Sequence, residues 1–217
     1  MNRTVNRQLI VFTRFPEAGT TKTRLIPVLG ARGAARLQRK MTEHVLKRVG
    51  GGCGRFTLGV EIRFDGGDEK QMQAWLGNTY RYRPQGDGSL GRRMAAAFED
   101  AFQKRADQAV LIGTDIPGLA AATVEDAFAG LDRADAVFGP AADGGYYLIG
   151  MRRGAFAAAQ KLFADIRWGT DRVLADTLQI AAASGLRTRL LEELADVDSP
   201  GDLPVWEQEN AGQTPEP

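Results

Sequence analysis

The sequence holds a single cysteine and a single histidine among its 217 residues, and these scarcities exclude several kinds of site. One cysteine, Cys53, excludes an internal disulfide framework and a thiolate metal cluster. One histidine, His44, excludes multi-histidine zinc sites and disfavours a Ser-His-Asp hydrolase. His44 lies in a helical pattern with Leu37, Met41 and Val45, so we expect it at the edge of a helix face. Any chemistry must therefore come from carboxylates, cations, backbone amides and a borrowed metal ion.

Net charge and long hydrophobic runs are also lacking. The chain carries 28 Lys and Arg against 27 Asp and Glu, and a formal net charge of +1 gives no reason to expect a nucleic acid as partner. No apolar run approaches the roughly 20 residues of a membrane span. The run at 9–12 is too short for the core of a signal peptide. We therefore expect a cytoplasmic protein with small-molecule ligands; nothing indicates its oligomeric state.

Apolar, β-rich runs alternate with helical patterns along the whole chain. The expected strands lie at 8–13, 56–62, 79–83, 109–113, 136–139, 146–150 and, weakly, 187–191. The expected helices lie at 32–49, 68–76, 90–105, 123–131, 154–164, 170–183 and 200–209. This alternation predicts an α/β fold with a mainly parallel sheet covered on both faces. The length favours a single domain over 1–206, followed by a polar tail over 207–217.

Two helix starts carry capping signals. Thr123 is followed three residues later by Asp126, and Ser199 is followed at the same spacing by Asp202. Both pairs have the spacing of a capping box, and Pro200 stands where its missing N–H costs nothing.

The loop after the first strand is cationic and contains a glycine. Arg14, Lys22 and Arg24 surround Gly19 there. Ligands of open parallel sheets bind beyond the carboxyl ends of the strands, and a glycine loop with projecting cations suits a di- or triphosphate. The alternative is a solvated basic loop. The segment GTTKT is not a P-loop, because its glycine is not adjacent to the lysine.

A second glycine-rich loop, GDGSLG at 86–91, fits the G-x-G-x-x-G pattern and precedes a helix. A dinucleotide site is one alternative, but the preceding strand, TYRYR, is polar, whereas that motif needs a buried apolar strand. A turn that approaches a nucleotide base is favoured over both the dinucleotide site and a plain loop.

Acidic residues follow the later strands. Asp115 directly follows a buried strand and is a candidate ligand for Mg²⁺ or Mn²⁺ against a bound diphosphate; an Asx-turn is its alternative. The segment at 143–145, DGG, is either a tight hairpin turn or a place where substrate touches backbone. Asp196 and Asp198 precede a helix, where acidic charge is favoured without any ligand. Trp168 is either a core residue or a platform for an acceptor.

Taken together, these motifs resemble a bacterial family of nucleotide-diphospho-sugar transferase-like proteins. The resemblance covers residues 8 to 205 and rests on the segments FTRFPEAGTTKTRL, QGDGSLGRRM, GTDIPGL, GPAADGGYYLIG, WGT and DVDSPGDL in this order. The family is similar to GT-A glycosyltransferases and small nucleotidyltransferases, and its motif style is close to that of 2-phospholactate guanylyltransferases. It implies a three-layer αβα sandwich with a mostly parallel sheet and one reversed strand.

The resemblance also implies roles for particular residues. Those that would bind the nucleotide phosphates are Arg14, Gly19, Lys22 and Arg24. Those that would lie near the base are Gln85, Gly86 and Gly88. The metal carboxylates would be Asp115 and Asp198. The acceptor or sugar side would hold Asp143, Gly144 and Gly145, with Trp168 as a platform.

The implied activity is a metal-dependent transfer from a nucleotide-activated donor to a small-molecule acceptor, with Lys22, Asp115 and Asp143 as catalytic residues. We put glycosyl transfer from a nucleotide sugar first, with Asp143 as the base. The alternative is nucleotidyl transfer from an NTP to a small phosphorylated acceptor, where Lys22 and Arg24 offset charge on the leaving pyrophosphate. An alternative of another class is a non-catalytic nucleotide-binding regulator. The chain departs from both branches, since it lacks G-G-x-S-x-R-M after the first strand and has Gly113 where D-x-D needs an aspartate.

Overall fold

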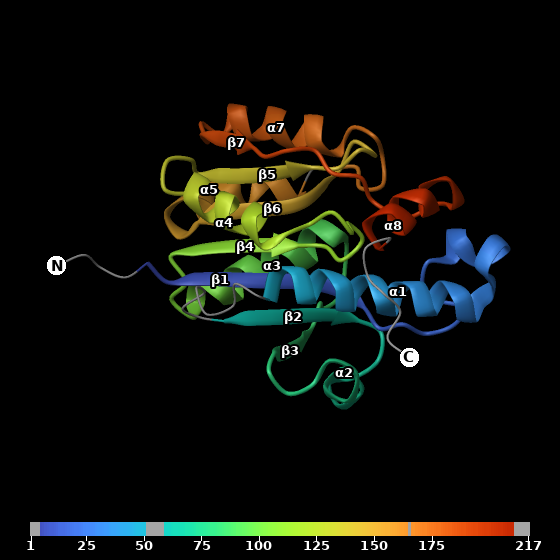
Figure 1. Ribbon diagram of the computed structural model, residues 1–217. Helices are drawn as coiled ribbons and strands as arrows, with labels where there is room; N and C mark the ends of the chain where they lie inside the picture. The colour runs from blue at the N-terminus through green and yellow to red at the C-terminus, as the bar shows by residue number, and fades with distance from the viewer. Residues whose placement is uncertain (1–4, 51–58, 165, 211–217) are drawn as a thin grey trace.

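The computed structural model describes residues 5–50, 59–164 and 166–210, which form three layers around one seven-stranded sheet (Figure 1). The strand order is β3-β2-β1-β4-β6-β5-β7. The strands are β1 Arg7–Arg14, β2 Val60–Asp65, β3 Arg81–Pro84, β4 Gln108–Ile112, β5 Ala136–Pro140, β6 Tyr146–Arg152 and β7 Thr188–Leu190. All seven expected strands are present, although the start of the second prediction, at 56–58, lies outside the described residues.

One strand of the seven runs against the others, as the resemblance implies. β6 pairs antiparallel with both β4 and β5, while the other four pairings are parallel. β5 and β6 are joined directly as a hairpin, whose turn lies at the edge where β1 and β4 end. The predicted fold class, a three-layer αβα sandwich with one reversed strand, is confirmed.

Helices cover both faces of the sheet. They are α1 Ile26–Gly50, α2 Glu69–Leu76, α3 Leu90–Gln103, α4 Ala121–Gly130, α5 Phe156–Ala159, α6 Lys161–Ala164, α7 Val173–Ala183 and α8 Leu203–Asn210. In Figure 1, α1 and α4 lie in front of the sheet and α3 lies behind it, while α8 lies near the edge to which β1 points. No helix in the described ranges is long and apolar enough to cross a membrane.

The buried strands show why the sequence forms a doubly covered sheet. Along β1, Leu9 and Val11 belong to the apolar core under α1, α2 and α4. Ile10 and Phe12 point to the other face and belong to the core with α3, α6 and α7. Side chains alternate between faces along a strand, so a strand covered on both sides must be apolar at every position.

Several sequence predictions need correction. The predicted helix at 154–164 is broken into a 3-10 helix at Arg153–Ala155 and the short helices α5 and α6. α1 begins before residue 32, at Ile26, because it continues from a 3-10 helix and passes a non-helical Gly30. The predicted cap at Thr123 is wrong, since α4 begins at Ala121 after an N-cap that has no side-chain hydrogen bond.

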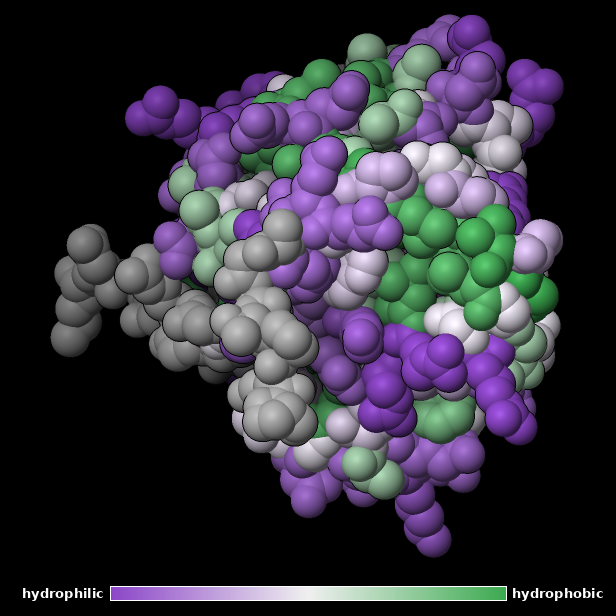
Figure 2. All heavy atoms as spheres, turned by 45° about the vertical axis from the view of Figure 1, so that its right-hand side comes forward, coloured by the Kyte–Doolittle hydropathy of each residue, from purple (hydrophilic) through white to green (hydrophobic). Residues whose placement is uncertain are grey.

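The end of the chain packs on the start of α1. Leu203, Val205 and Trp206 of the α8 segment join a third apolar cluster centred on Leu25 and Met41. α8 ends at Asn210, and the rest of the predicted tail, 211–217, lies outside the described residues. Figure 2 turns this edge of the molecule forward and shows a mostly hydrophilic surface on which hydrophobic residues gather on the right and near the top. The single-domain boundary at 206 stays a prediction.

Asp135 ties three strands together, and we expect its contribution to stability to vanish in acid. It accepts hydrogen bonds from the backbone and side chain of Arg187 and contacts Arg152. The Arg187 hydrogen bond, against the cost of burial, lowers the pKa of Asp135 from 3.8 to about 2. Its stabilisation is therefore complete above pH 3.8 and is lost as the pH falls through 2.

Asp135→Asn should cost about 1 kcal/mol at pH 6, a value reduced because Arg187 is exposed and solvent screens the pair. Urea unfolding of parent and variant at pH 6 and near pH 2 measures the difference. A cost that is equal at both pH values would show that the carboxylate charge is not involved.

Candidate functional site

A cavity of about 480 Å³ lies at the carboxyl ends of the parallel strands. The ends of β1, β2 and β4, the start of α3 and the β5–β6 turn line it, together with β6, α1 and the loops before α7 and α8. The predicted site residues that line it are Arg14, Lys22, Gln85, Asp115, Asp143, Gly145, Trp168 and Asp198. Those that belong to the same loops but do not line it are Gly19, Arg24, Gly86, Gly88 and Gly144.

Lys22 is held between the two aspartates that were predicted to bind a metal. Its Nζ lies 2.9 Å from Oδ1 of Asp115 and 3.6 Å from Oδ1 of Asp198. The side chain of Lys22 is 3% exposed, whereas those of Asp115 and Asp198 are 47% and 42% exposed. The lysine therefore lies beneath the two carboxylates, and the free sides of the carboxylates face the cavity.

The late loop is fixed by backbone groups of Val197. Its carbonyl accepts a hydrogen bond of 2.6 Å from Lys22 Nζ, and its N–H donates to the carbonyl of Asp115 at 2.9 Å. The predicted capping box of Ser199 and Asp202 is confirmed, and the Asp202 carboxylate also accepts from the N–H of Asp198. Burial raises the pKa of Asp196, and the negative charges of Asp143, Asp202 and Asp198 add to the increase. This end of the cavity therefore carries an excess of negative charge.

Two arginines on the other side share Asp65 at the end of β2. Arg14 donates to Asp65 Oδ2 at 2.6 Å, and Arg93 NH1 lies 3.8 Å from the same oxygen. Gln85 fixes Arg93 in turn, since its Oε1 accepts from Arg93 at 2.8 Å while its Nε2 donates to the carbonyl of Thr13. Nε of Arg93 is buried without a partner among the described atoms. The cations on this side are thus aimed by neutral or acidic neighbours and keep donors for a ligand.

The floor between these two sides is a cluster of buried hydroxyl groups. Thr13 Oγ1 lies 2.9 Å from Thr42 Oγ1 and 3.1 Å from Thr114 Oγ1, and Gln38 Nε2 donates to Thr42 at 3.2 Å. Thr13, Thr114 and Gln38 line the cavity. Because each threonine hydroxyl both donates and accepts, these partners satisfy one another and fix the ends of β1 and β4 relative to α1.

The segment at 143–145 forms the turn of the β5–β6 hairpin, one of its two predicted alternatives. Oδ1 of Asp143 accepts a hydrogen bond of 2.8 Å from the N–H of Gly145. Gly144 has φ +86°, and a Cβ there would lie 2.1 Å from the carbonyl oxygen of Asp171. The turn therefore requires glycine for two reasons, and it still presents the exposed Asp143 carboxylate to the cavity.

Aromatic residues form the wall beside this turn. Tyr146 contacts Phe138 and Trp168 edge-on, with ring centroids 5.5 and 6.2 Å away. The hydroxyl of Tyr146 is buried and makes no hydrogen bond of good geometry among the described atoms, although Thr177 lies close to it. Burial raises the pKa of Tyr146, so the hydroxyl stays protonated. Trp168 and the ring of Tyr146 thus form an apolar wall.

Gly91 is the third glycine of G-x-G-x-x-G, and its role here is to admit Trp168. A Cβ on Gly91 would lie 2.2 Å from the carbonyl oxygen of Phe163 and 2.8 Å from the Trp168 ring. We expect Gly91→Ala to push α3 and Trp168 apart and to cost about 1–3 kcal/mol of stability, as overpacking does.

Denaturant unfolding measures that cost, and tryptophan fluorescence reports the displacement of Trp168. Gly154→Ala is the matched control, since a Cβ at Gly154 would meet nothing within 4 Å. Equal stability of the two variants would contradict the close-packing role of Gly91.

His44 takes no part in the cavity. Its Nε2 lies 2.9 Å from the carbonyl oxygen of Pro117, and its ring packs edge-on against Trp206. His44 is buried, so the expectation of a helix-face edge needs correction, although the residue does lie away from the cavity. Cys53 lies outside the described residues.

The donor set fits a divalent ion only in part. No group of three or more His, Cys, Asp or Glu side chains in the described part of the chain is arranged to hold a metal. Asp115 Oδ1 is buried without a hydrogen bond of good geometry, although Lys22 Nζ lies 2.9 Å away. Mg²⁺ is commonly held by one or two carboxylates together with substrate phosphates and water. Asp115 and Asp198 therefore fit an ion that arrives with a phosphate ligand.

Three residues that the sequence analysis did not name contribute to the site: Asp65, Arg93 and Tyr146. Asp196 also lines the cavity, although its sequence position indicated only a helix-start charge. Arg93 lies within the quoted QGDGSLGRRM segment. Asp65 ends β2 and Tyr146 begins β6, both at the cavity edge. Their position at that edge was the signal that could have found them.

Comparisons with known proteins agree with this architecture. A family profile described as uncharacterized proteins conserved in bacteria, DUF2064, matches residues 54–170. The crystal structure of a protein from Desulfovibrio desulfuricans G20, provisionally named a nucleotide-diphospho-sugar transferase, is 34% identical with a TM-score of 0.87, covering 97% of this chain and 90% of that one. The search of curated proteins found no match.

More distant structures share the fold. CMP:2-keto-3-deoxy-manno-octonic acid synthetase in complex with CTP is 15% identical with a TM-score of 0.58, covering 96% of this chain and 100% of that one. Rv0371c from Mycobacterium tuberculosis H37Rv in complex with manganese is 17% identical with a TM-score of 0.56, covering 94% of this chain and 98% of that one. The chain thus has the fold of GT-A-like nucleotidyl and sugar transferases.

Proposed function

We propose that this chain, which belongs to the DUF2064 family, is a nucleotidyltransferase that transfers a nucleotide from an NTP to a small-molecule acceptor. The observation that carries the proposal is one cavity that three cations line. Lys22 lies between Asp115 and Asp198, while Arg14 and Arg93 lie on the other side. A triphosphate needs more positive charge than the diphosphate of a nucleotide sugar. The CTP complex of a protein with the same fold supports this choice of donor over a nucleotide sugar.

Different residues would bind the nucleotide donor and the acceptor substrate. Arg14 and Arg93 would bind phosphate oxygens, since both line the cavity and Asp65 orients them. Gln85 is a positioning residue that acts through Arg93. Trp168 and the ring of Tyr146 would take the acceptor through apolar contacts.

In this reaction an acceptor oxygen attacks the α-phosphorus, a new P–O bond forms, and the bond from that phosphorus to the bridging oxygen breaks. Pyrophosphate leaves with the bond's electron pair, and positively charged side chains lower the cost of that charge. Asp115 and Asp198 would hold Mg²⁺ or Mn²⁺ beside the phosphates, where such an ion supplies further stabilisation of the developing charge. An acceptor with an ionised phosphate needs no general base, which suits a cavity in which the described part of the chain places no histidine.

Glycosyl transfer is the second candidate, and one observation favours it. The protein that is 34% identical over nearly the whole chain carries the name of a nucleotide-diphospho-sugar transferase. The base for that reaction would be Asp143, but its Oδ1 is already engaged with the N–H of Gly145. This hydrogen bond leaves the other carboxylate oxygen for that role, so we place glycosyl transfer second because of the CTP complex of a protein with the same fold.

Thermal unfolding in the presence of NTPs and nucleotide sugars, each with and without Mg²⁺ or Mn²⁺, tests the proposal. A ligand at 100 times its Kd adds about 2.7 kcal/mol of stability, which a melting curve resolves. We expect the larger shifts from an NTP with metal, followed by pyrophosphate release when the acceptor is supplied. Shifts from nucleotide sugars alone would favour glycosyl transfer. Metal-independent nucleotide binding without turnover would favour a regulator.

A further inference from the structure

We propose that Lys22 acts as a built-in cation between Asp115 and Asp198, so that these carboxylates bind a divalent ion weakly until phosphates draw the lysine away. The nucleotide in this inference rests on the proposed function, but the competition between Lys22 and a metal ion does not. The proposal concerns the order in which the cavity fills, and it follows from the contacts of one buried ammonium group.

The ammonium group of Lys22 has three oxygen neighbours in the protein. It donates a hydrogen bond of 2.6 Å to the carbonyl of Val197, and it forms ion pairs with Asp115 Oδ1 at 2.9 Å and Asp198 Oδ1 at 3.6 Å. The side chain is 3% exposed. An ammonium that is desolvated in this way must keep its acceptors or replace them, because a buried charge without partners is costly.

The backbone of Lys22 indicates that this placement is specific. Lys22 has φ 49° and ψ 45°, the left-handed conformation that a non-glycine residue seldom adopts. Its carbonyl begins the 3-10 helix Thr23–Leu25 by accepting from the N–H of Leu25 at 2.9 Å. Such strain persists where the surroundings over-determine it, and here the carboxylates and Val197 supply the determining contacts.

A divalent ion and this ammonium would compete for the same oxygen atoms. An ion bound by Asp115 Oδ1 would lie close to Nζ, since that oxygen is 2.9 Å from the ammonium, and the two positive charges would repel. Without nucleotide, a displaced Lys22 loses its acceptors and gains none. Phosphate oxygens offer new acceptors, so nucleotide and metal should each strengthen the binding of the other.

The test measures Mn²⁺ binding alone, without nucleotide, through the electron paramagnetic resonance signal of free Mn²⁺. Lys22→Met keeps an unbranched side chain, shorter by one heavy atom, and removes its charge. We expect it to bind Mn²⁺ at least about tenfold more tightly than the parent. Arg24→Met is the matched control, because Arg24 also pairs with Asp198, at 2.8 Å, but is 72% exposed. Its affinity should change by less than about threefold.

The outcomes separate the competing explanations. An equal gain in both variants would mean that general electrostatics, and not displacement, controls the ion. An unchanged or weaker affinity in folded Lys22→Met would overturn the inference, and so would a parent that already binds Mn²⁺ as tightly as that variant. Lys22→Gln is a second variant without the charge, to be used if Lys22→Met does not fold. Circular dichroism checks that both variants are folded. If Lys22→Met gains Mn²⁺ affinity but the parent protein shows no NTP-dependent activity, the proposed function is wrong and this inference stands.

Discussion

Asp115→Asn is expected to leave the fold intact and to abolish the stimulation of nucleotide binding by Mn²⁺. Asparagine has the same shape and keeps an amide oxygen near Lys22 Nζ, which lies 2.9 Å from the carboxylate. It lacks the negative charge that a hard divalent ion requires. Loss of a residue that supports a metal ligand costs about 10- to 100-fold in metal affinity, and loss of the ligand itself should cost at least as much.

Calorimetric titration of nucleotide into both proteins, with and without Mn²⁺, measures this effect. Asp143→Asn is a suitable comparison, because it removes the same charge from the same cavity and retains the oxygen that accepts from Gly145. Its metal dependence should persist. An Asx-turn role for Asp115 predicts the opposite result, since asparagine forms that turn equally well, and unchanged metal dependence would favour it.

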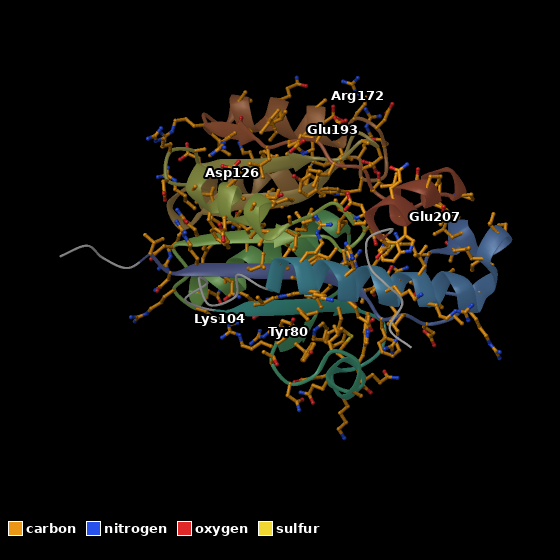
Figure 3. All side chains as sticks on the ribbon, viewed as in Figure 1. Tyr80, Lys104, Asp126, Arg172, Glu193 and Glu207 are labelled. Atoms are coloured by element: carbon orange, nitrogen blue, oxygen red, sulfur yellow. The ribbon has the colours of Figure 1, made fainter. Side chains whose placement is uncertain are left out.

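Arg63→Met should reduce the free energy of unfolding by about 3 kcal/mol, the largest stability effect we expect from one substitution. Arg63 and Glu61 on β2 are each 4% exposed and form a pair of 2.8 Å. Asp100 and Lys104 of the α3 segment complete the cluster, at 2.5 Å from Arg63 and 2.7 Å from Glu61. Lys104 lies away from the cavity, toward the opposite edge of the sheet (Figure 3). The cluster therefore bears on stability and not on the site.

Urea unfolding measures the loss, and Arg83→Met is the control. Arg83 lies 3.3 Å from Asp100 but is half-exposed, so its removal should cost less than about 1 kcal/mol. A comparable loss in the two variants would show that burial of the Arg63 charge does not matter.

The pH dependence of the same variants gives an independent check. Burial would raise the pKa of Glu61, but the hydrogen bond from Lys104 and the charge of Arg63 outweigh it and hold the pKa below 4.5. Stability from Glu61 is thus complete above pH 4.5 and declines in acid. In Arg63→Met the decline should begin at higher pH.

The sheet was predictable because the apolar residues within each strand's own sequence indicate that the strand is buried. Continuous apolar runs such as Leu9–Phe12 and Val110–Ile112 are required by a sheet covered on both faces. The reversal of β6 was not readable from its own residues, and it came from the family resemblance. The break in the helix at 154–164 was also hidden, because the alanine-rich pattern there fits one helix as well as two short ones.

The site was predictable as a set of loops but not as a set of contacts. Strand-end reasoning selected Asp115 and Lys22, and both line the cavity. The pairing of Lys22 with Val197, which is 175 positions later in the chain, depends on where the late loop returns. Arg93 was missed for a similar reason: its importance arises from Gln85 and Asp65, which approach it only in the folded sheet.

Because β6 is reversed, the two sides of the cavity come from separate stretches of the sequence. Because the hairpin brings its turn to the edge where the parallel strands end, the cations come from residues 14–93, while the aromatic wall and the acidic turn come from 143–168. α4 and β5 separate these stretches. Lys22 and Arg24 join the first to the late loop through Asp198. Under the proposed function, acceptor preference can therefore diverge by substitution or insertion in the second stretch while the first stretch, proposed to bind phosphates, is left as it is.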